Sequence, residues 1–195
     1  MINNLSEHLI QVMLSKGYIT DNEKEIYAYG MFMMISQMLL FVLTGIFGII
    51  FSCIDKATIF YIAFQLIRKY AGGYHATTES RCEILSAISI FICVFVIKIS
   101  NTYNFYDVLL ICTSVSVIAI LIFAPIDTPE KPLDSNEKKY FRKKTWIIVL
   151  IILTIICLSL FFEINTFTYP CCMSLILESI LLFLGKIKEI RKKNG

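Results

Sequence analysis

The feature of this sequence that most constrains its fold is the separation of its charged residues from long apolar runs. Of the 195 residues, 57% are hydrophobic and only 17% are charged, and the charges are confined to a few short stretches. The intervening runs are about 15 to 25 residues long, which suits helices that cross a hydrocarbon core ~30 Å thick. Lipid offers the backbone no hydrogen-bond partners, and the runs lack the alternation of barrel strands. The sequence therefore predicts an all-α, polytopic integral membrane protein.

About six transmembrane helices are predicted, preceded by an N-terminal amphipathic helix. Residues 2–14 place apolar side chains at helical spacing, and Gly17 follows as a stop signal. Residues 20–23 match a capping box that opens the next helix. The second crossing is the shortest, and a re-entrant helix is the alternative there. The crossings are expected at residues 29–51, 57–67, 84–99, 108–126, 146–162 and 170–184, with Pro170 in the first turn of the last helix.

The distribution of Lys and Arg predicts the orientation of the chain, which we expect to form a single membrane domain over residues 1–195. If both termini are cytoplasmic, 16 of the 18 Lys and Arg residues fall on the inner side, and only Lys56 and Lys98 fall on the outer side. This asymmetry agrees with the positive-inside rule. The inner segments are an interfacial segment (1–27), a catalytic segment (68–83), a basic cytoplasmic loop (127–145) and a basic C-terminal tail (185–195).

The segment from Arg68 to Cys82 contains the strongest candidates for chemistry, His75 and Cys82. On one continuous helix, their separation would correspond to about 10.5 Å of rise, which is too far for a hydrogen bond. The helix must therefore be interrupted if His75 and Cys82 are to meet. Gly72-Gly73 before the histidine and Thr77-Thr78 after it permit such a break, because glycine adopts unusual backbone dihedrals and threonine favours helix caps.

A second capping box, with Ser80 at the N-cap and Glu83 at the third position, would put Cys82 in the first turn of the third crossing helix. The helix dipole and a nearby histidine favour the thiolate form of a cysteine there. Cys82 would then act as a nucleophile and His75 as its general base. The alternative is a loop cysteine and a histidine that never meet, and spacing alone supports both interpretations equally. The segment offers too few ligands for zinc, so no metal or cofactor is expected.

Three further positions are candidates for a supporting or substrate-binding role. Arg68 could hold a substrate carboxylate or stabilise an oxyanion, or it could be an interface anchor whose charge reaches the headgroups. Gly72-Gly73 could supply N–H donors near the reacting carbonyl, or could only let the chain turn. Glu178 lies in the sixth apolar run, where a carboxylate is costly. It could position substrate, pair with Arg68, or be a protonated packing residue bonded to Ser174 or Ser179.

The pattern R-x-x-x-G-G-x-H-x6-C, which ends at Cys82, resembles the core of the AgrB (accessory gene regulator B) family of membrane cysteine endopeptidases. The length, the amphipathic N-terminal segment, the several crossings and a loop with Pro125, Lys131 and Pro132 are also similar to this family. The resemblance implies that Cys82 is the nucleophile and His75 the base, with Arg68 and Gly73 in support.

The resemblance also implies a function in quorum sensing. Family members cleave an AgrD-type propeptide at its C-terminal tail on the cytoplasmic side of the bacterial cell membrane. An acyl-enzyme thioester would form, and a cysteine or serine of the precursor would displace the enzyme to close a thiolactone or lactone ring. Membrane lipids and a homodimer are further expected partners, whereas nucleic acid is not.

Two alternatives to a peptidase were considered. Gln37, Gln65 and Glu178 at membrane depth, together with several crossings, are also compatible with a peptide transporter or permease that lacks peptidase chemistry. A structural membrane subunit is the third hypothesis. Replacing Cys82 separates the peptidase from both, because only a peptidase would lose its processing activity.

Overall fold

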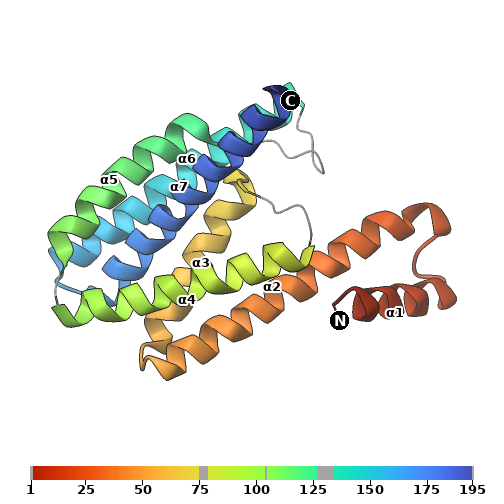
Figure 1. Cartoon of the computed structure of the whole chain (residues 1–195), viewed down its shortest axis with the longest axis horizontal. Coiled ribbons are helices and arrows are strands. Elements are labelled where there is room, and N and C mark those ends of the chain that lie inside the picture. The colour runs from red at the N-terminus through yellow and green to blue at the C-terminus, as the bar shows by residue number, and fades with distance from the viewer. Residues whose placement is uncertain (1, 75–78, 104, 127–133, 195) are drawn as a thin grey trace. The chain divides into compact units, whose positions relative to one another are not determined.

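The computed structural model describes residues 2–74, 79–103, 105–126 and 134–194. Within these residues the chain is helical apart from short connections and one isolated bridge (Figure 1). The elements are α1 (Ile2–Ser15), the 3-10 turn η1 (Asp21–Glu23), α2 (Lys24–Ile50), α3 (Ile54–Ala71), α4 (Glu79–Tyr103), α5 (Tyr106–Phe123), α6 (Ser135–Phe161) and α7 (Asn165–Asn194). The predicted all-α class is confirmed.

Five of these helical stretches are long and apolar enough to cross a membrane. They are Asp21–Ile50, Arg81–Ser100, Tyr106–Phe123, Ser135–Phe161 and Asn165–Arg191. The protein is therefore a multi-pass membrane protein. The second of the predicted crossings, now α3, is not among the five because charged residues lie near both of its ends. Its 18 residues nevertheless form one unbroken helix, about 27 Å long, with no turn back inside it.

The chain divides into two compact units, Met1–Leu43 and Thr44–Gly195. In the first unit, α1 confirms the predicted N-terminal helix, and Gly17 follows it with a φ of 72°. The capping box is also confirmed. The Glu23 carboxylate accepts hydrogen bonds from the Thr20 amide at 3.0 Å and from the Thr20 hydroxyl at 2.8 Å. The single membrane domain remains a prediction.

In the second unit, α7 is the helix around which the others pack. It contacts α3, α4, α5 and α6, and Figure 1 shows it (dark blue) alongside α5 and α6. A hydrogen bond of 3.0 Å joins Ser179 of α7 to Ser116 of α5, and Thr168 of α7 donates to Ser159 of α6 at 2.9 Å. Small hydroxyl residues of this kind let helices approach closely in lipid.

The outward face of α5 shows why this packing suits a bilayer. Its buried face carries Leu109, Thr113, Ser116 and Ile120, whereas the opposite face exposes the apolar stripe Ile111, Val115, Ile118 and Ile122. An apolar stripe of this size is unfavourable in water but not against lipid tails. The sequence pattern of α5 is therefore apolar on both faces, with Thr113 and Ser116 turned inward.

Helix α2 approaches α3 through a tight turn. Cys53 N donates to Gly48 O at 2.8 Å, and a Cβ atom built at Gly48 would lie 2.8 Å from the Cα of Ile54 and 3.0 Å from the Cβ of Ala57. Gly48 is therefore needed because there is no room for a side chain. Phe51, at the end of this turn, packs its ring 5.5 Å from that of Phe95 on α4.

Several predicted helix boundaries are wrong because helices continue past their apolar stretches. The segment 135–145 was assigned to a loop but forms the start of α6, where Asp134 N donates to the Glu137 carboxylate in a capping box. Residues 185–194 were assigned to a tail but continue α7. Pro170 is not in the first turn, because α7 begins at Asn165. Lys and Arg are good helix formers, so an aqueous extension costs little.

The basic segments of the second unit gather at one end of its helices. Near the end of α3, the ring of Tyr70 lies 5.9 Å from Phe141 of α6, and Lys188 of α7 lies 5.5 Å from the ring of Tyr74. Lys98 instead lies close enough to Cys53 to influence it electrostatically, at the α2–α3 turn that also carries Lys56. The end of α3, the start of α6 and the end of α7 thus lie together, while the side of the membrane on which they lie remains a prediction.

Candidate active site

The chain leaves α3 through two glycines and Tyr74, which we call the approach segment (residues 72–74). Gly72 has a φ of 74° and Gly73 a φ of 128°, values that favour glycine over any other residue. Gly72 N donates to Arg68 O at 3.2 Å and so caps the helix. That N–H group is therefore already used, and the glycine pair serves the turn rather than presenting Gly72 N to a substrate carbonyl.

The approach segment is fixed on one side by the residues that follow α5. Ile126 N donates to Ala71 O at 3.1 Å, and Gly72 and Ile126 form an isolated parallel bridge. A Cβ atom at Gly72 would lie 2.6 Å from Ile126 O, so the two backbones touch without room for a side chain. The start of the segment is thus tied to the end of the fourth predicted crossing.

On the other side, the approach segment lies against α7. Tyr74 N donates to Leu181 O at 3.0 Å, and a Cβ atom at Gly185 would come within 3.0 Å of both Gly73 C and Tyr74 N. Glu178, Leu181 and Gly185 are spaced three and four residues apart, so they share one face of α7. This face of α7 supports the approach segment along its length.

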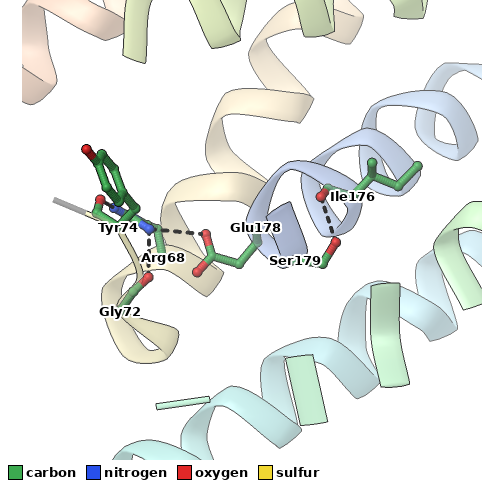
Figure 2. A network of polar contacts seen from close by, with 6 residues as sticks. All are labelled: Arg68, Gly72, Tyr74, Ile176, Glu178 and Ser179. Atoms are coloured by element: carbon green, nitrogen blue, oxygen red, sulfur yellow. Dashed lines mark hydrogen bonds and ion pairs between the residues drawn. The ribbon is translucent and has the colours of Figure 1, made fainter. Parts of the chain in front are cut away.

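Arg68 lies between the approach segment and Glu178, as Figure 2 shows. Its Nη1 donates to Gly72 O at 2.8 Å and its Nη2 to Tyr74 O at 2.6 Å, while Nη1 lies 3.9 Å from Glu178 Oε2. The Arg68 side chain is only 18% exposed, so it does not reach out to the headgroups. Two of its donors are committed to the protein's own backbone.

Glu178 is fully buried, and its two oxygens accept no hydrogen bond within the part of the chain that the structure describes. Of the three interpretations considered for it, the geometry matches the pairing with Arg68. The serines are engaged elsewhere: Ser174 donates to Cys171 O at 2.8 Å, and Ser179 donates to Ile176 O at 2.8 Å and shares a hydrogen bond with the Ser116 hydroxyl. The carboxylate thus has a charge partner but no hydrogen-bond donor among these residues.

Cys82 is the fourth residue of α4 and is partly exposed. The predicted N-cap at Ser80 is wrong, because α4 already begins at Glu79 and so includes Ser80. Cys82 nevertheless lies in the first turn, where the backbone N–H groups have no partner within the helix. His75, the proposed base, lies outside the described residues, as do Lys131 and Pro132 of the proline-containing loop.

The structure thus brings together four of the predicted site residues, Arg68, Gly72, Gly73 and Glu178, and places Cys82 on the next helix. Gln65 was a candidate for a transport role. Its Nε2 donates to the Tyr61 hydroxyl of the same helix at 2.7 Å, and this contact gives no support to a role in substrate binding. Within the described ranges, no three His, Cys, Asp or Glu side chains are grouped closely enough to hold a metal ion.

Sequence reasoning missed the residues that hold the approach segment from outside, which are Ile126, Leu181 and Gly185. Two of them act through backbone atoms, for which side-chain patterns give no signal. The sequence did contain a signal for Gly185, because it is a single glycine between an apolar run and a basic helix end. A close backbone contact is a common reason for glycine at such a position. The packing of Lys188 on the Tyr74 ring was also not anticipated.

The fold and site together define a multi-pass helical membrane protein in which a partly exposed cysteine follows a rigidly held glycine turn. The family model for Accessory gene regulator B matches residues 3–182. The chain therefore belongs to the AgrB family, which processes the precursors of autoinducing peptides in quorum sensing, and whose substrates are propeptides of the AgrD type.

Individual relatives agree with this assignment. A putative AgrB-like protein of Clostridium perfringens (strain SM101 / Type A) is 35% identical over 159 residues, covering 78% of this chain and 73% of the relative. A putative AgrB-like protein of Listeria monocytogenes serotype 4a (strain HCC23) is 26% identical over 83% of this chain and 80% of its own length. Protein FsrB of Enterococcus faecalis (strain ATCC 47077 / OG1RF) is 27% identical over 58% of this chain and 47% of its own. No solved structure matches the chain significantly.

Proposed function

We propose that this protein is a membrane cysteine endopeptidase that removes the C-terminal tail of a quorum-sensing propeptide. Cys82 is the nucleophile and His75 the general base. The observation that carries the proposal is the position of Cys82, which is partly exposed in the first turn of α4. The family supplies the substrate class, and the hydrogen bonds of the approach segment hold the residue directly before His75 in the sequence.

The proposed reaction begins when the Cys82 thiolate attacks the carbonyl at the junction between the future signal and its tail. The C–N bond breaks, and the protonated imidazole of His75 gives its proton to the leaving amine. The acyl group remains on Cys82 as a thioester. A cysteine or serine within the precursor then attacks this thioester, its proton passes to His75, and the Cys82 thiolate leaves as a thiolactone or lactone ring closes. Exclusion of water from the site keeps the thioester for cyclisation.

The charge distribution supports an active site on the cytoplasmic side of the membrane. The approach segment lies at the end of the second unit where Lys188 and the basic start of α6 are found. Cytoplasmic loops carry an excess of Lys and Arg, and thiols stay reduced in that compartment. A homodimer, which the family resemblance implies, and membrane lipids as partners of the basic segments remain predictions.

The test is cleavage of a co-expressed AgrD-type precursor by Cys82→Ala. The variant should accumulate in the membrane but release no tail fragment. Cys157→Ala makes the same chemical change at an exposed position of α6 and should cleave at the wild-type rate. Normal processing by Cys82→Ala would exclude the peptidase and favour a transporter or a structural subunit.

A further inference from the structure

The buried carboxylate of Glu178 is unusual because it has a charge partner but no hydrogen-bond donor among the described residues. Moving a carboxylate out of water costs roughly several kcal/mol, and attraction to a nearby opposite charge can offset this cost. The group that faces Glu178 is Arg68, with 3.9 Å between Oε2 and Nη1. The role of Glu178 is therefore inferred from the contacts that Arg68 makes.

Arg68 binds two carbonyl groups of the approach segment, those of Gly72 and Tyr74. The guanidinium is a planar fork with fixed donor directions, so one side chain can hold two backbone oxygens at a set separation. These oxygens belong to the residues that lead into His75. Figure 2 shows the guanidinium between them and α7, where Glu178 approaches from the opposite side.

We propose that Glu178 is a positioning residue, which orients the Arg68 fork so that it holds residues 72–74, directly before the proposed base in the sequence, in one conformation. Glu178 thus acts on the reaction through Arg68 and the backbone and does not touch the substrate. This inference rests on the proposed function, since it assigns the purpose of the arrangement to the general base. Helix α7 then fixes the approach segment in two ways. Glu178 orients Arg68, and the carbonyl of Leu181 accepts a hydrogen bond from Tyr74 N.

The first test is Glu178→Gln, which keeps the shape of the side chain and removes its charge. The matched control is Glu189→Gln on the same helix, where the carboxylate forms a more exposed pair with Lys186 at 2.8 Å. Hydrogen exchange should be faster at the amides of Gly72 and Tyr74 in Glu178→Gln and unchanged in the control. Precursor cleavage should lose about 10- to 100-fold in kcat, with KM changed less than about twofold, because a misplaced catalytic group affects the chemical step.

A second variant covers the case in which Glu178→Gln does not fold. Gly185→Ala leaves Arg68 and Glu178 intact and improves the intrinsic helix propensity of α7, but its Cβ would press on Gly73 and Tyr74. It should show the same faster exchange and the same loss in kcat, although less of each. Wild-type exchange and wild-type kcat in a folded Glu178→Gln or Gly185→Ala variant would overturn the proposal.

The hydrogen-exchange measurement separates this inference from the proposed function. If Cys82→Ala still cleaves the precursor, the peptidase assignment fails, and with it the purpose given to Glu178. If Cys82→Ala is inactive while Glu178→Gln exchanges and cleaves like the wild type, only the positioning role fails. If both lose kcat and only Glu178→Gln loosens the approach segment, both proposals stand.

Discussion

The backbone amide of Tyr74 donates to the carbonyl oxygen of Leu181 across 3.0 Å, joining the segment after α3 to the last helix of the chain. The carbonyl of the same residue accepts from Arg68, so both backbone polar groups of Tyr74 are satisfied within the protein. A residue held in this way has little freedom to rotate. The residue that follows it in the sequence is His75, whose imidazole the proposed reaction needs in a defined place.

Gly73→Ala should inactivate the protein. The added Cβ would overlap Arg68 Nη1, and the φ of 128° at this position is strained for any side chain. We expect precursor cleavage to fall about 100-fold or more, as for other displaced catalytic groups. Gly45→Ala is the matched control because no atom lies within 4 Å of its Cβ position, and it should cleave normally. Equal activity of the two alanine variants would contradict the assigned geometry.

Arg68→Lys should be nearly as damaging as Arg68→Ala. Lysine keeps the charge opposite Glu178 but is a point donor and cannot hold the carbonyls of Gly72 and Tyr74 with the same geometry. We expect at least about a tenfold loss in cleavage rate, measured in membranes with equal amounts of enzyme. The reverse exchange at the neighbouring position, Lys69→Arg, should be silent. If Arg68→Lys retained full activity, charge alone would explain the role of Arg68.

Gly48→Ala should destabilise the second unit without touching the candidate site. A methyl group at Gly48 would collide with the Ile54 backbone and Ala57, forcing α2 away from α3. Overpacking of this kind costs about 1–3 kcal/mol. Thermal unfolding in detergent should show a lower midpoint for Gly48→Ala than for Gly45→Ala on the same helix. A midpoint at or above that of the control would mean that the turn has room to relax.

The cysteines should differ in their reaction with a water-soluble alkylating reagent. Burial raises the pKa of the Cys53 thiol, although the positive charge of Lys98 opposes part of this effect. Because only the thiolate reacts, labelling of Cys53 should begin at higher pH than labelling of an ordinary thiol. Cys82, which is partly exposed, should be labelled before the buried Cys53 at neutral pH, as mass spectrometry of the digested protein would show. Earlier labelling of Cys53 would indicate that the α2–α3 turn opens.

Much of the fold could be predicted from hydrophobic runs alone, because lipid leaves helices as the available structure for each run. The ends of α6 and α7 could not, since propensity and capping decide how far a helix continues into water. The pair Asp134 and Glu137 carried the capping signal for α6, and it was overlooked. For Pro170, the apolar run was mistaken for the whole helix.

The candidate site was predicted unevenly. The pairing of Arg68 with Glu178 was among the alternatives because a carboxylate at membrane depth needs a cation. The contacts of Leu181 and Ile126 could not have been predicted, since they join backbone groups of segments that are distant in the sequence. Local sequence therefore identifies the residues whose side chains could take part in a reaction, while the long-range packing of α7 determines how these residues are held.

The shared face of Glu178, Leu181 and Gly185 makes the register of the C-terminal helix part of the geometry of the candidate site. One residue inserted between Glu178 and Gly185 would turn the glycine away by about 100° and leave the carboxylate where it was. Substitutions on the outward side of α7 should therefore be tolerated, whereas a change of length between these positions would remove the support of the candidate site.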